Sequence, residues 1–326
     1  MSAILHAGID NILWLQEFQT PGSYALWTIF TNFGGTYYLY MVPALLWVVD
    51  YRLGLRVLVM LTATLIVNSI LKELFAQPRP FEFDPRVVSD GEIGYGLPSG
   101  HAQLAVLFWG VMADWVDRKP FWIFALAMMF LMGMSRMILG VHFPTDVFAG
   151  WLLGGLMLWA YRRYRAGFEA RLAELDSPRL SLEILIAAGA SFVLVWMAGT
   201  DLAPLGAGVF GMIVGVGFGA AVGTRFLSFQ GHGPWWQRIL RYCLGLVVLL
   251  FFLATISGAG IPEGGLGALV LAGELALIGG WLTLGGPWLF EMLSVMKLPN
   301  AMVAQRRWTG VAEARPLLAI SEQYRM

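Results

Sequence analysis

Long apolar runs, separated by short polar breaks, account for most of the sequence. An apolar run of about 20 residues is long enough to cross the hydrocarbon core of a bilayer as a helix. Only helices and closed barrels satisfy their backbone hydrogen bonds inside lipid. Charged residues make up 13% of the chain, about half the fraction typical of soluble domains. We therefore predict an all-α, polytopic integral membrane protein with about nine transmembrane helices. The predicted spans are 36–50, 54–75, 99–117, 121–139, 144–161, 180–199, 203–223, 239–257 and 265–284.

The first 35 residues differ from the predicted spans because they mix polar and apolar positions. In residues 3–31, apolar side chains repeat at helical spacing, with Asp10 and Glu17 on the opposite side. This amphipathic pattern favours helices that lie in the membrane interface. The charged segment 162–179 is predicted to be cytoplasmic. The predicted domains are an interfacial N-terminal part at 1–35, a core at 36–165, a linker at 166–179, a C-terminal transmembrane bundle at 180–297 and a cytoplasmic tail at 298–326.

The basic residues predict the orientation of the chain. The 21 basic and 21 acidic residues cancel, so no net field attracts a polyanion and no nucleic-acid partner is expected. With nine spans, 17 of the basic residues fall on one side of the membrane. The positive-inside rule makes that side, with the C-terminus, cytoplasmic. The four basic residues left on the exoplasmic side are Lys72, Arg79, Arg86 and Arg136.

Three polar segments at the ends of predicted spans share this exoplasmic face. Together they hold three cations and two imidazoles, which are the groups expected around a phosphate. The residues are Lys72 and Arg79 in the first segment, Ser99, Gly100 and His101 in the second, and Arg136, His142 and Asp146 in the third. The other charged residues between the first two segments, which include Glu92, are predicted to be ordinary loop charges or to screen the entrance.

Two local patterns strengthen the prediction of a phosphate site. Ser99 and Gly100 stand at the start of a predicted helix, where backbone N–H groups and the helix dipole attract anions. Asp146 lies four residues after His142. Its carboxylate can accept a hydrogen bond from one ring nitrogen of His142 and leave the other nitrogen free for nucleophilic attack.

These segments carry a resemblance to a known family. The sequence contains K-x6-R-P from Lys72, P-S-G-H from Pro98 and S-R-x5-H-x3-D from Ser135, in this order. Over roughly residues 20–165 the chain resembles the type 2 phosphatidic acid phosphatase (PAP2) superfamily, of which these are the signatures. The resemblance implies a PAP2-like helical bundle, followed here by an additional transmembrane bundle.

The resemblance also implies a role for each signature residue. His142 would be the nucleophile that forms a phosphohistidine, Asp146 would orient it, and His101 would protonate the leaving group. No metal and no cofactor would be needed, because fixed cations and N–H donors would stabilise the transferred group. The residues that would hold the phosphoryl oxygens are Lys72, Arg79, Ser99, Gly100 and Arg136.

The function implied by the resemblance is hydrolysis of a lipid phosphate or diphosphate at the exoplasmic or periplasmic face of a bacterial inner membrane. Undecaprenyl diphosphate, phosphatidate and phosphatidylglycerophosphate are the candidate substrates. The expected partners are an amphiphilic lipid-phosphate substrate and membrane lipids, and homo-oligomerisation stays open. Three alternatives remain: a phosphotransferase to a lipid or sugar acceptor, a sugar-phosphate phosphatase, and a non-enzymatic lipid transporter.

Two residues and one glycine pattern lie outside the signatures. Glu274 falls inside a predicted span, where an acid costs about 2.5–3.5 kcal/mol on insertion scales. We favour a structural acid with a polar partner over a functional cavity. Cys243, the single cysteine, is predicted to be a buried, inert thiol. The repeated glycines of span 203–223 predict close helix packing.

Overall fold

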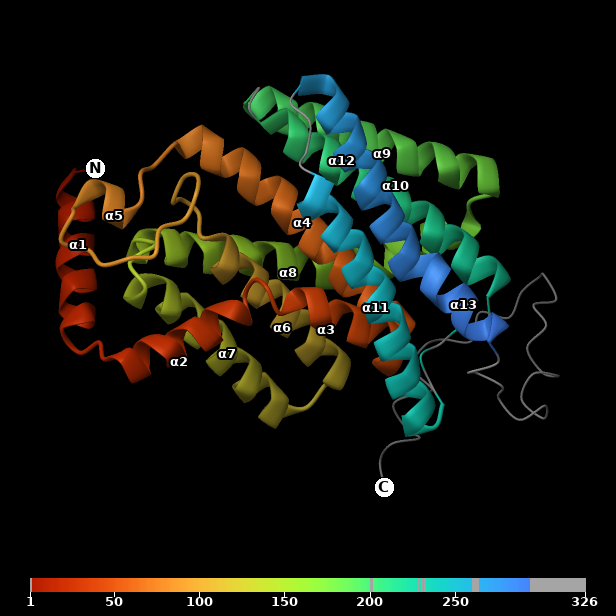
Figure 1. Ribbon diagram of the computed structural model, residues 1–326, viewed down its shortest axis with the longest axis horizontal. Coiled ribbons are helices and arrows are strands. Elements are labelled where there is room, and N and C mark those ends of the chain that lie inside the picture. Colours follow the sequence, from red (N-terminus) through yellow and green to blue (C-terminus); the bar gives the residue numbers. More distant parts are fainter. Residues whose placement is uncertain are drawn as a thin grey trace.

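The computed structural model of the protein describes residues 2–199, 202–227, 229, 231, 233–259 and 264–293, and this part of the chain contains helices and loops but no strand (Figure 1). The predicted all-α class is confirmed, and the predicted tail 298–326 lies outside the described residues. The helices are α1 Ser2–Glu17, α2 Pro21–Asn32, α3 Tyr38–Ala44, π-helix η1 Leu45–Val49, α4 Tyr51–Phe75, α5 Pro80–Phe83, α6 Gly100–Val116, α7 Lys119–Ile138, α8 Pro144–Glu174, α9 Ser177–Ala198, α10 Ala203–Phe226, α11 Trp235–Ala259, α12 Gly264–Gly280, π-helix η3 Trp281–Gly285 and α13 Gly286–Met292.

Six helices of the described chain are long and apolar enough to cross a membrane. They are α4, α7, α9, α10, α11 and the continuous run from α12 through α13. The polytopic membrane class is therefore confirmed, whereas the count of nine is not. Each of the other three predicted spans coincides with a helix but differs in length or charge. α6 has 17 residues, about 25 Å, which is at the lower limit for a span. α8 has 31 residues, and its C-terminal part is charged.

The third of these, predicted span 36–50, is short because it begins inside the bundle. α3 and η1 together run from Tyr38 to Val49, about 18 Å. The break before them, which contains Gly34 and Gly35, lies against His101 at the start of α6. A Cβ atom on Gly35 would stand 2.6 Å from His101 Nε2. The chain therefore enters the bundle through this break and covers the remaining depth with a short helix.

The N-terminal helix α1 lies across one end of the bundle, roughly perpendicular to α8 (Figure 1). Its apolar stripe is buried: Leu5, Ile9 and Ile12 form a small core with Val87 and Phe143. This core connects α1 to the loop before α6 and to the loop before α8. The predicted amphipathic helix thus covers the end of the bundle where the polar segments meet.

The glycines of α10 allow α12 to approach it closely, as the sequence pattern predicts. A Cβ atom on Gly211 would lie 1.9 Å from the carbonyl oxygen of Ala272, and one on Gly215 would lie 2.1 Å from that of Ala276. No side chain fits between the two backbones at these positions. Close approach of this kind replaces the hydrophobic driving force that helices lack in lipid.

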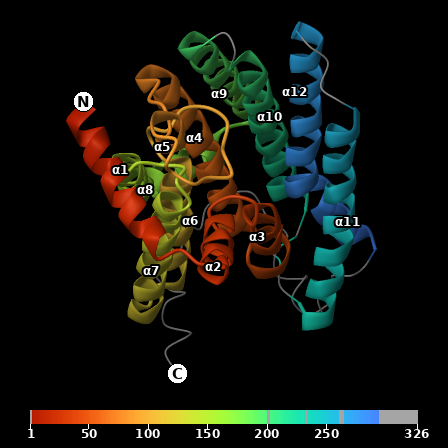
Figure 2. The same cartoon turned by 60° about the vertical axis from the view of Figure 1, so that its left-hand side comes forward.

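One hydrophobic core extends from α3 and α4 into the C-terminal helices. Figure 2 shows α3 and α4 between the N-terminal helices on one side and α10, α11 and α12 on the other. Two side chains join the halves by hydrogen bonds to η3. Trp47 Nε1 donates to the carbonyl of Leu282 at 3.0 Å, and Tyr51 Oη donates to that of Thr283 at 2.6 Å. The π-helix presents these carbonyls to the partner helices.

Two residues singled out in the sequence behave differently from expectation. Cys243 on α11 is exposed, so the predicted buried thiol is wrong. Only one face of α11 packs against the bundle, and Cys243 lies on the other. Glu274 on α12 is half-buried, and its Oε2 atom has no hydrogen-bond partner among the described residues. The expected polar partner of this carboxylate is therefore not found in the described part of the chain.

Candidate active site

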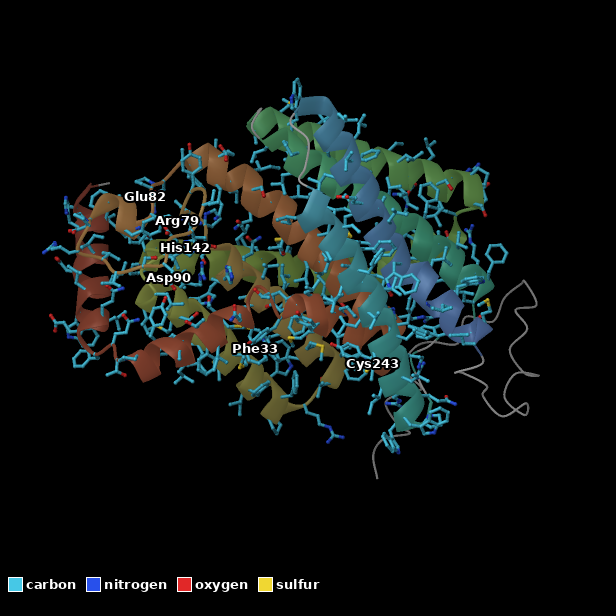
Figure 3. The ribbon with its side chains drawn as sticks, in the orientation of Figure 1. Phe33, Arg79, Glu82, Asp90, His142 and Cys243 are labelled. Atoms are coloured by element: carbon cyan, nitrogen blue, oxygen red, sulfur yellow. The ribbon has the colours of Figure 1, made fainter. Side chains whose placement is uncertain are left out.

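The three predicted segments meet at the end of the bundle that α1 covers. α4 ends at Phe75, about one turn after Lys72, because the next residue, Ala76, adopts the left-handed conformation with φ 43°. α6 and α8 both begin at this end, and they pack so closely that a Cβ atom on Gly150 would lie 2.5 Å from the carbonyl oxygen of Ser99. Figure 3 shows Arg79 and His142 next to each other at this end, with Asp90 in the same region.

His142 and Asp146 form the centre of the site. Both side chains are buried, and His142 Nδ1 lies 3.3 Å from Asp146 Oδ2. Because an ionised carboxylate only accepts hydrogen bonds, Nδ1 carries the proton and Nε2 presents its lone pair. Asp146 Oδ2 also accepts from the backbone N–H of Phe143 at 2.9 Å, and Oδ1 accepts from Gln77 Nε2 at 2.6 Å. The carboxylate is therefore held in place by three groups.

Arg79 lies beside the free nitrogen of His142. Its Nη1 atom is 3.5 Å from His142 Nε2 and donates to the carbonyl of Val141 at 3.0 Å. Its Nε and Nη2 atoms donate to the carbonyls of Gly94 and Ile93 at 2.6 and 3.2 Å. The side chain is completely buried. Backbone carbonyls on both sides thus fix the direction of this guanidinium.

Arg136 reaches the same place from the last turn of α7. Its Nη1 atom donates to Thr31 Oγ1 of α2 at 2.7 Å, and its Nη2 atom forms an ion pair with Glu92. Glu92 Oε2 also accepts from Arg79 Nη1 at 2.8 Å. One carboxylate oxygen therefore joins the two buried arginines, so the prediction that Glu92 is an ordinary loop charge is wrong.

Two buried donors of the site have no hydrogen-bond partner within the described residues. They are the hydroxyl of Ser99 and Nε of Arg136. A buried donor without a partner is costly, and such groups in a polar cluster are available to bind a ligand. Ser99 occupies the N-cap position of α6, but its side chain makes no capping bond. Its hydroxyl and the helix N-terminus together form an anion-binding arrangement.

The start of α6 is held from α4 by Asn68. Its Nδ2 atom donates to the carbonyl of Pro98 at 3.2 Å and to Gln103 Oε1 at 3.0 Å. A Cβ atom on Gly100 would lie 3.1 Å from Asn68 Oδ1. An alanine at position 100 would therefore require the Asn68 side chain to shift by a few tenths of an ångström.

The electrostatic environment favours a neutral imidazole at His142. Burial, and then the positive charges of Arg136 and Arg79, lower the pKa of His142 well below its ordinary value. Lys72 and His101 lower the pKa of His142 in the same way, so both lie within electrostatic reach of it. A neutral imidazole among fixed cations is suited to attack a phosphorus atom whose oxygens those cations hold.

The contacts of three residues at the site escaped the sequence analysis. Gln77 lies inside the first signature, but nothing in its spacing shows that it contacts Asp146. Thr31 and Glu92 contact Arg136 from segments far away in the sequence. Only their positions in the fold bring them to the signature residues.

Comparisons with known proteins match both halves of the chain. Residues 53–169 match the family described as the PAP2 superfamily. Residues 207–298 match the family described as the transmembrane extension of PAP2 superfamily phosphatases. The first match contains all eight predicted site residues. The second begins within α10 and covers α11 to α13.

Among curated proteins, undecaprenyl-diphosphatase of Sulfolobus acidocaldarius is 32% identical over 133 residues, which cover 40% of this chain and 64% of that protein. Phosphatidylglycerophosphatase B of Bacillus subtilis is 32% identical over 128 residues, covering 36% of this chain and 59% of that protein. Sphingosine-1-phosphate phosphatase 2 of Homo sapiens is 25% identical over 133 residues, which cover 37% of this chain and 32% of that protein. The chain thus spans less than two thirds of the length of each of these relatives.

Two solved structures resemble the fold in part. Aquifex aeolicus LpxE matches with a TM-score of 0.43 and 24% identity, covering 48% of this chain and 94% of that one. A transmembrane PAP2-type phosphatidylglycerolphosphate phosphatase from Bacillus subtilis matches with a TM-score of 0.44 and 23% identity. The match covers 54% of this chain and 90% of that one. The sequence families are the stronger finding, and they occur in order along the chain. The chain therefore contains a PAP2 superfamily domain at residues 53–169, followed at residues 207–298 by the transmembrane extension of PAP2 superfamily phosphatases.

Proposed function

We propose that the protein is a membrane phosphatase that hydrolyses a lipid phosphate or diphosphate through a phosphohistidine. The observation that carries the proposal is the arrangement around His142: Nδ1 faces Asp146 at 3.3 Å and Nε2 faces Arg79. This geometry leaves a lone pair of the imidazole directed at the place where the buried cations would hold a phosphoryl group. The substrates named for the curated relatives, which are lipid phosphates or diphosphates, support the same class.

In the first step, His142 Nε2 attacks phosphorus and the bond from phosphorus to the leaving oxygen breaks. His101 donates a proton to that oxygen, and the lipid alcohol or lipid monophosphate leaves. Asp146 accepts the hydrogen bond of Nδ1–H and stabilises the positive charge that develops on the ring. Lys72, Arg79 and Arg136, together with Ser99 and the N–H of Gly100, neutralise the phosphoryl oxygens in the transition state.

In the second step, water attacks the phosphohistidine. His101 takes a proton from the water, the bond from Nε2 to phosphorus breaks, and inorganic phosphate is released. His142 returns to its neutral form. General acid–base catalysis of this kind contributes about 10²–10⁴-fold to a rate, and His101 supplies it in both steps.

A lipid substrate is favoured by the surroundings of the site. Exposed apolar side chains surround this end of the bundle: Trp14 is 58% exposed, Phe18 67% and Leu74 72%. A headgroup held at the end of the bundle would leave its tail among these side chains. We place this end at the exoplasmic face, because the basic residues of the sequence concentrate at the other end.

The test is release of phosphate by the purified full chain in detergent with EDTA. Undecaprenyl diphosphate, phosphatidate, phosphatidylglycerophosphate and a sugar phosphate form the substrate panel. His142→Ala should abolish release and leave the melting temperature nearly unchanged. His6→Ala is the matched control, because His6 packs against Phe83 outside the site. Full activity of the His142→Ala variant would rule out the mechanism.

The same assay separates the alternatives. Phosphate that appears on an added alcohol, with none released, would indicate a phosphotransferase. Turnover of the sugar phosphate alone would indicate a soluble substrate. An inert wild type that moves lipid between the leaflets of a vesicle would favour a transporter.

A further inference from the structure

Glu92 occupies a special position between the two buried arginines. Arg79 uses Nε and Nη2 on the carbonyls of Gly94 and Ile93, and Arg136 uses Nη1 on Thr31. The remaining amino groups, Nη1 of Arg79 and Nη2 of Arg136, both meet Glu92 Oε2. Each arginine is therefore oriented by fixed partners and directs one further amino group at a single carboxylate oxygen.

This carboxylate oxygen lies where a phosphoryl oxygen would bind. Arg79 Nη1, which donates to Glu92 at 2.8 Å, is itself 3.5 Å from His142 Nε2. A phosphoryl group within reach of His142 would need the same two guanidinium groups. A carboxylate and a phosphate offer these donors the same kind of charged oxygen, so they cannot both occupy the position.

Glu92 can leave without disturbing the arginines. Its side chain is 33% exposed, whereas those of Arg79 and Arg136 are 1% and 6% exposed. The neighbouring Ile93 is 99% exposed, so its side chain does not pack over Glu92. Rotation of the Glu92 side chain toward water would break its two ion pairs and leave the carbonyl contacts of Arg79 intact.

We propose that Glu92 is a resident counter-anion, which neutralises Arg79 and Arg136 when no phosphate is bound and is replaced by the phosphoryl group of the substrate. This rests on the proposed function, since it concerns the same site. Two buried guanidinium groups without an anion would be strongly destabilising. Glu92 removes that cost and competes with every anion that enters, including free inorganic phosphate.

The test measures binding rather than turnover. Inorganic phosphate is titrated into the purified full chain in detergent, with isothermal calorimetry and the melting temperature as readouts, for the wild type, Glu92→Gln and Glu92→Ala. Asp84→Asn is the matched control, because it removes one negative charge from the same loop, and the ion-pair partner of Asp84 among the described residues is the exposed Arg86. Both Glu92 variants should bind phosphate on the order of tenfold more tightly than the wild type. Asp84→Asn should bind it as the wild type does.

A second signature is stability. Without phosphate, Glu92→Gln should melt at a lower temperature than the wild type, and phosphate should raise its melting temperature by more, as linkage requires. Unchanged or weaker phosphate binding by both variants would overturn the proposal and make Glu92 a clamp that positions the arginines. A wild type that binds phosphate but releases none from any lipid would count against the proposed function alone.

Discussion

At the residue scale, the most informative contact is that between Gln77 and Asp146. The amide donates to Oδ1 of this buried carboxylate at 2.6 Å, whereas His142 Nδ1 lies near the other oxygen, Oδ2. We therefore propose that Gln77 is a positioning residue, which acts on His142 through Asp146. A hydrogen bond to a charged buried group contributes about 1.5–3 kcal/mol, which corresponds to a rate change of about 10- to 100-fold.

We expect Gln77→Ala to lower kcat by about 10- to 100-fold and to leave KM nearly unchanged, because the Gln77 amide donates its hydrogen bond to Asp146 rather than to a proposed phosphate-binding residue. Steady-state kinetics on a lipid phosphate measure kcat and KM separately. Combining Gln77→Ala with Asp146→Asn should add little to the effect of Asp146→Asn alone, since both act through one hydrogen bond. Additive losses, or a rise in KM alone, would show that Gln77 acts elsewhere.

The pH dependence follows from the lowered pKa of His142. In the proposed mechanism His142 must be neutral to attack phosphorus, and a lowered pKa means that its protonation requires a pH below the ordinary value of about 6.5. The acid limb of kcat/KM should therefore lie below pH 6.5. Arg136→Gln removes a nearby positive charge, raises the pKa of His142 and should shift the acid limb to higher pH.

The measurement is the profile of kcat/KM for both proteins on one substrate, so that titration of the substrate phosphate is common to both. Arg136→Gln also weakens phosphate binding, but that loss lowers the whole profile and does not move its acid limb. An acid limb at the same pH in both proteins would contradict the assignment to His142.

The sequence names candidate site residues, but it does not give their contacts. Lys72, Arg79, His101, Arg136, His142 and Asp146 belong to short signatures, and the ends of the helices bring these signatures together. Glu92 and Thr31 have no such pattern. They meet Arg136 only because the loop before α6 and the helix α2 cover the end of the bundle, and that packing is decided by tertiary structure.

At the element scale, the contact between α10 and α12 depends on glycine. The Cβ atom of an alanine at position 215 would stand 2.1 Å from the carbonyl oxygen of Ala276, and this backbone cannot move away alone. Gly215→Ala should therefore force the helices apart and cost about 1–3 kcal/mol of stability. Gly273 on α12 has nothing within 4 Å of its Cβ position, so Gly273→Ala is the matched control.

Melting temperatures in detergent should show opposite directions for the two substitutions. Gly215→Ala should melt earlier, whereas Gly273→Ala should melt at the same temperature or slightly later, because alanine favours the helix over glycine. Equal melting temperatures for both variants and the wild type would show that the glycine contact does not limit stability.

The helices differ in how far their sequences determine them. Long apolar runs predicted α4, α7, α9 and α10 to within a few residues. The run at 36–50 was also predicted as a span, but it forms only a short helix and a π-helix, because the break at Gly34 and Gly35 lies inside the bundle against His101. A hydropathy pattern contains no information on depth, so it cannot separate such a segment from a full span.

At the scale of the whole molecule, the two ends of the bundle differ in charge. α4 begins at the end opposite the site, where Arg56 pairs with Glu169 at 2.8 Å. Arg162 on α8 pairs with Asp114 and lies over the ring of Trp122 at the same end. These helices run about 25–40 Å from that end to the site. The cation-rich end is therefore remote from the site, and by the positive-inside rule we propose that this end is cytoplasmic.

This orientation predicts which end an impermeant thiol reagent reaches in intact cells. The background for both labelling variants is Cys243→Ala, because the native Cys243 is exposed and could itself react. Val88→Cys then places a thiol at the site end, where Val88 is 64% exposed. Arg118→Cys places one between α6 and α7 at the opposite end. We expect an impermeant maleimide to label Val88→Cys in intact cells and Arg118→Cys only after permeabilisation. Labelling in the reverse order would place the site in the cytoplasm, and the substrate would then be a lipid phosphate of the inner leaflet.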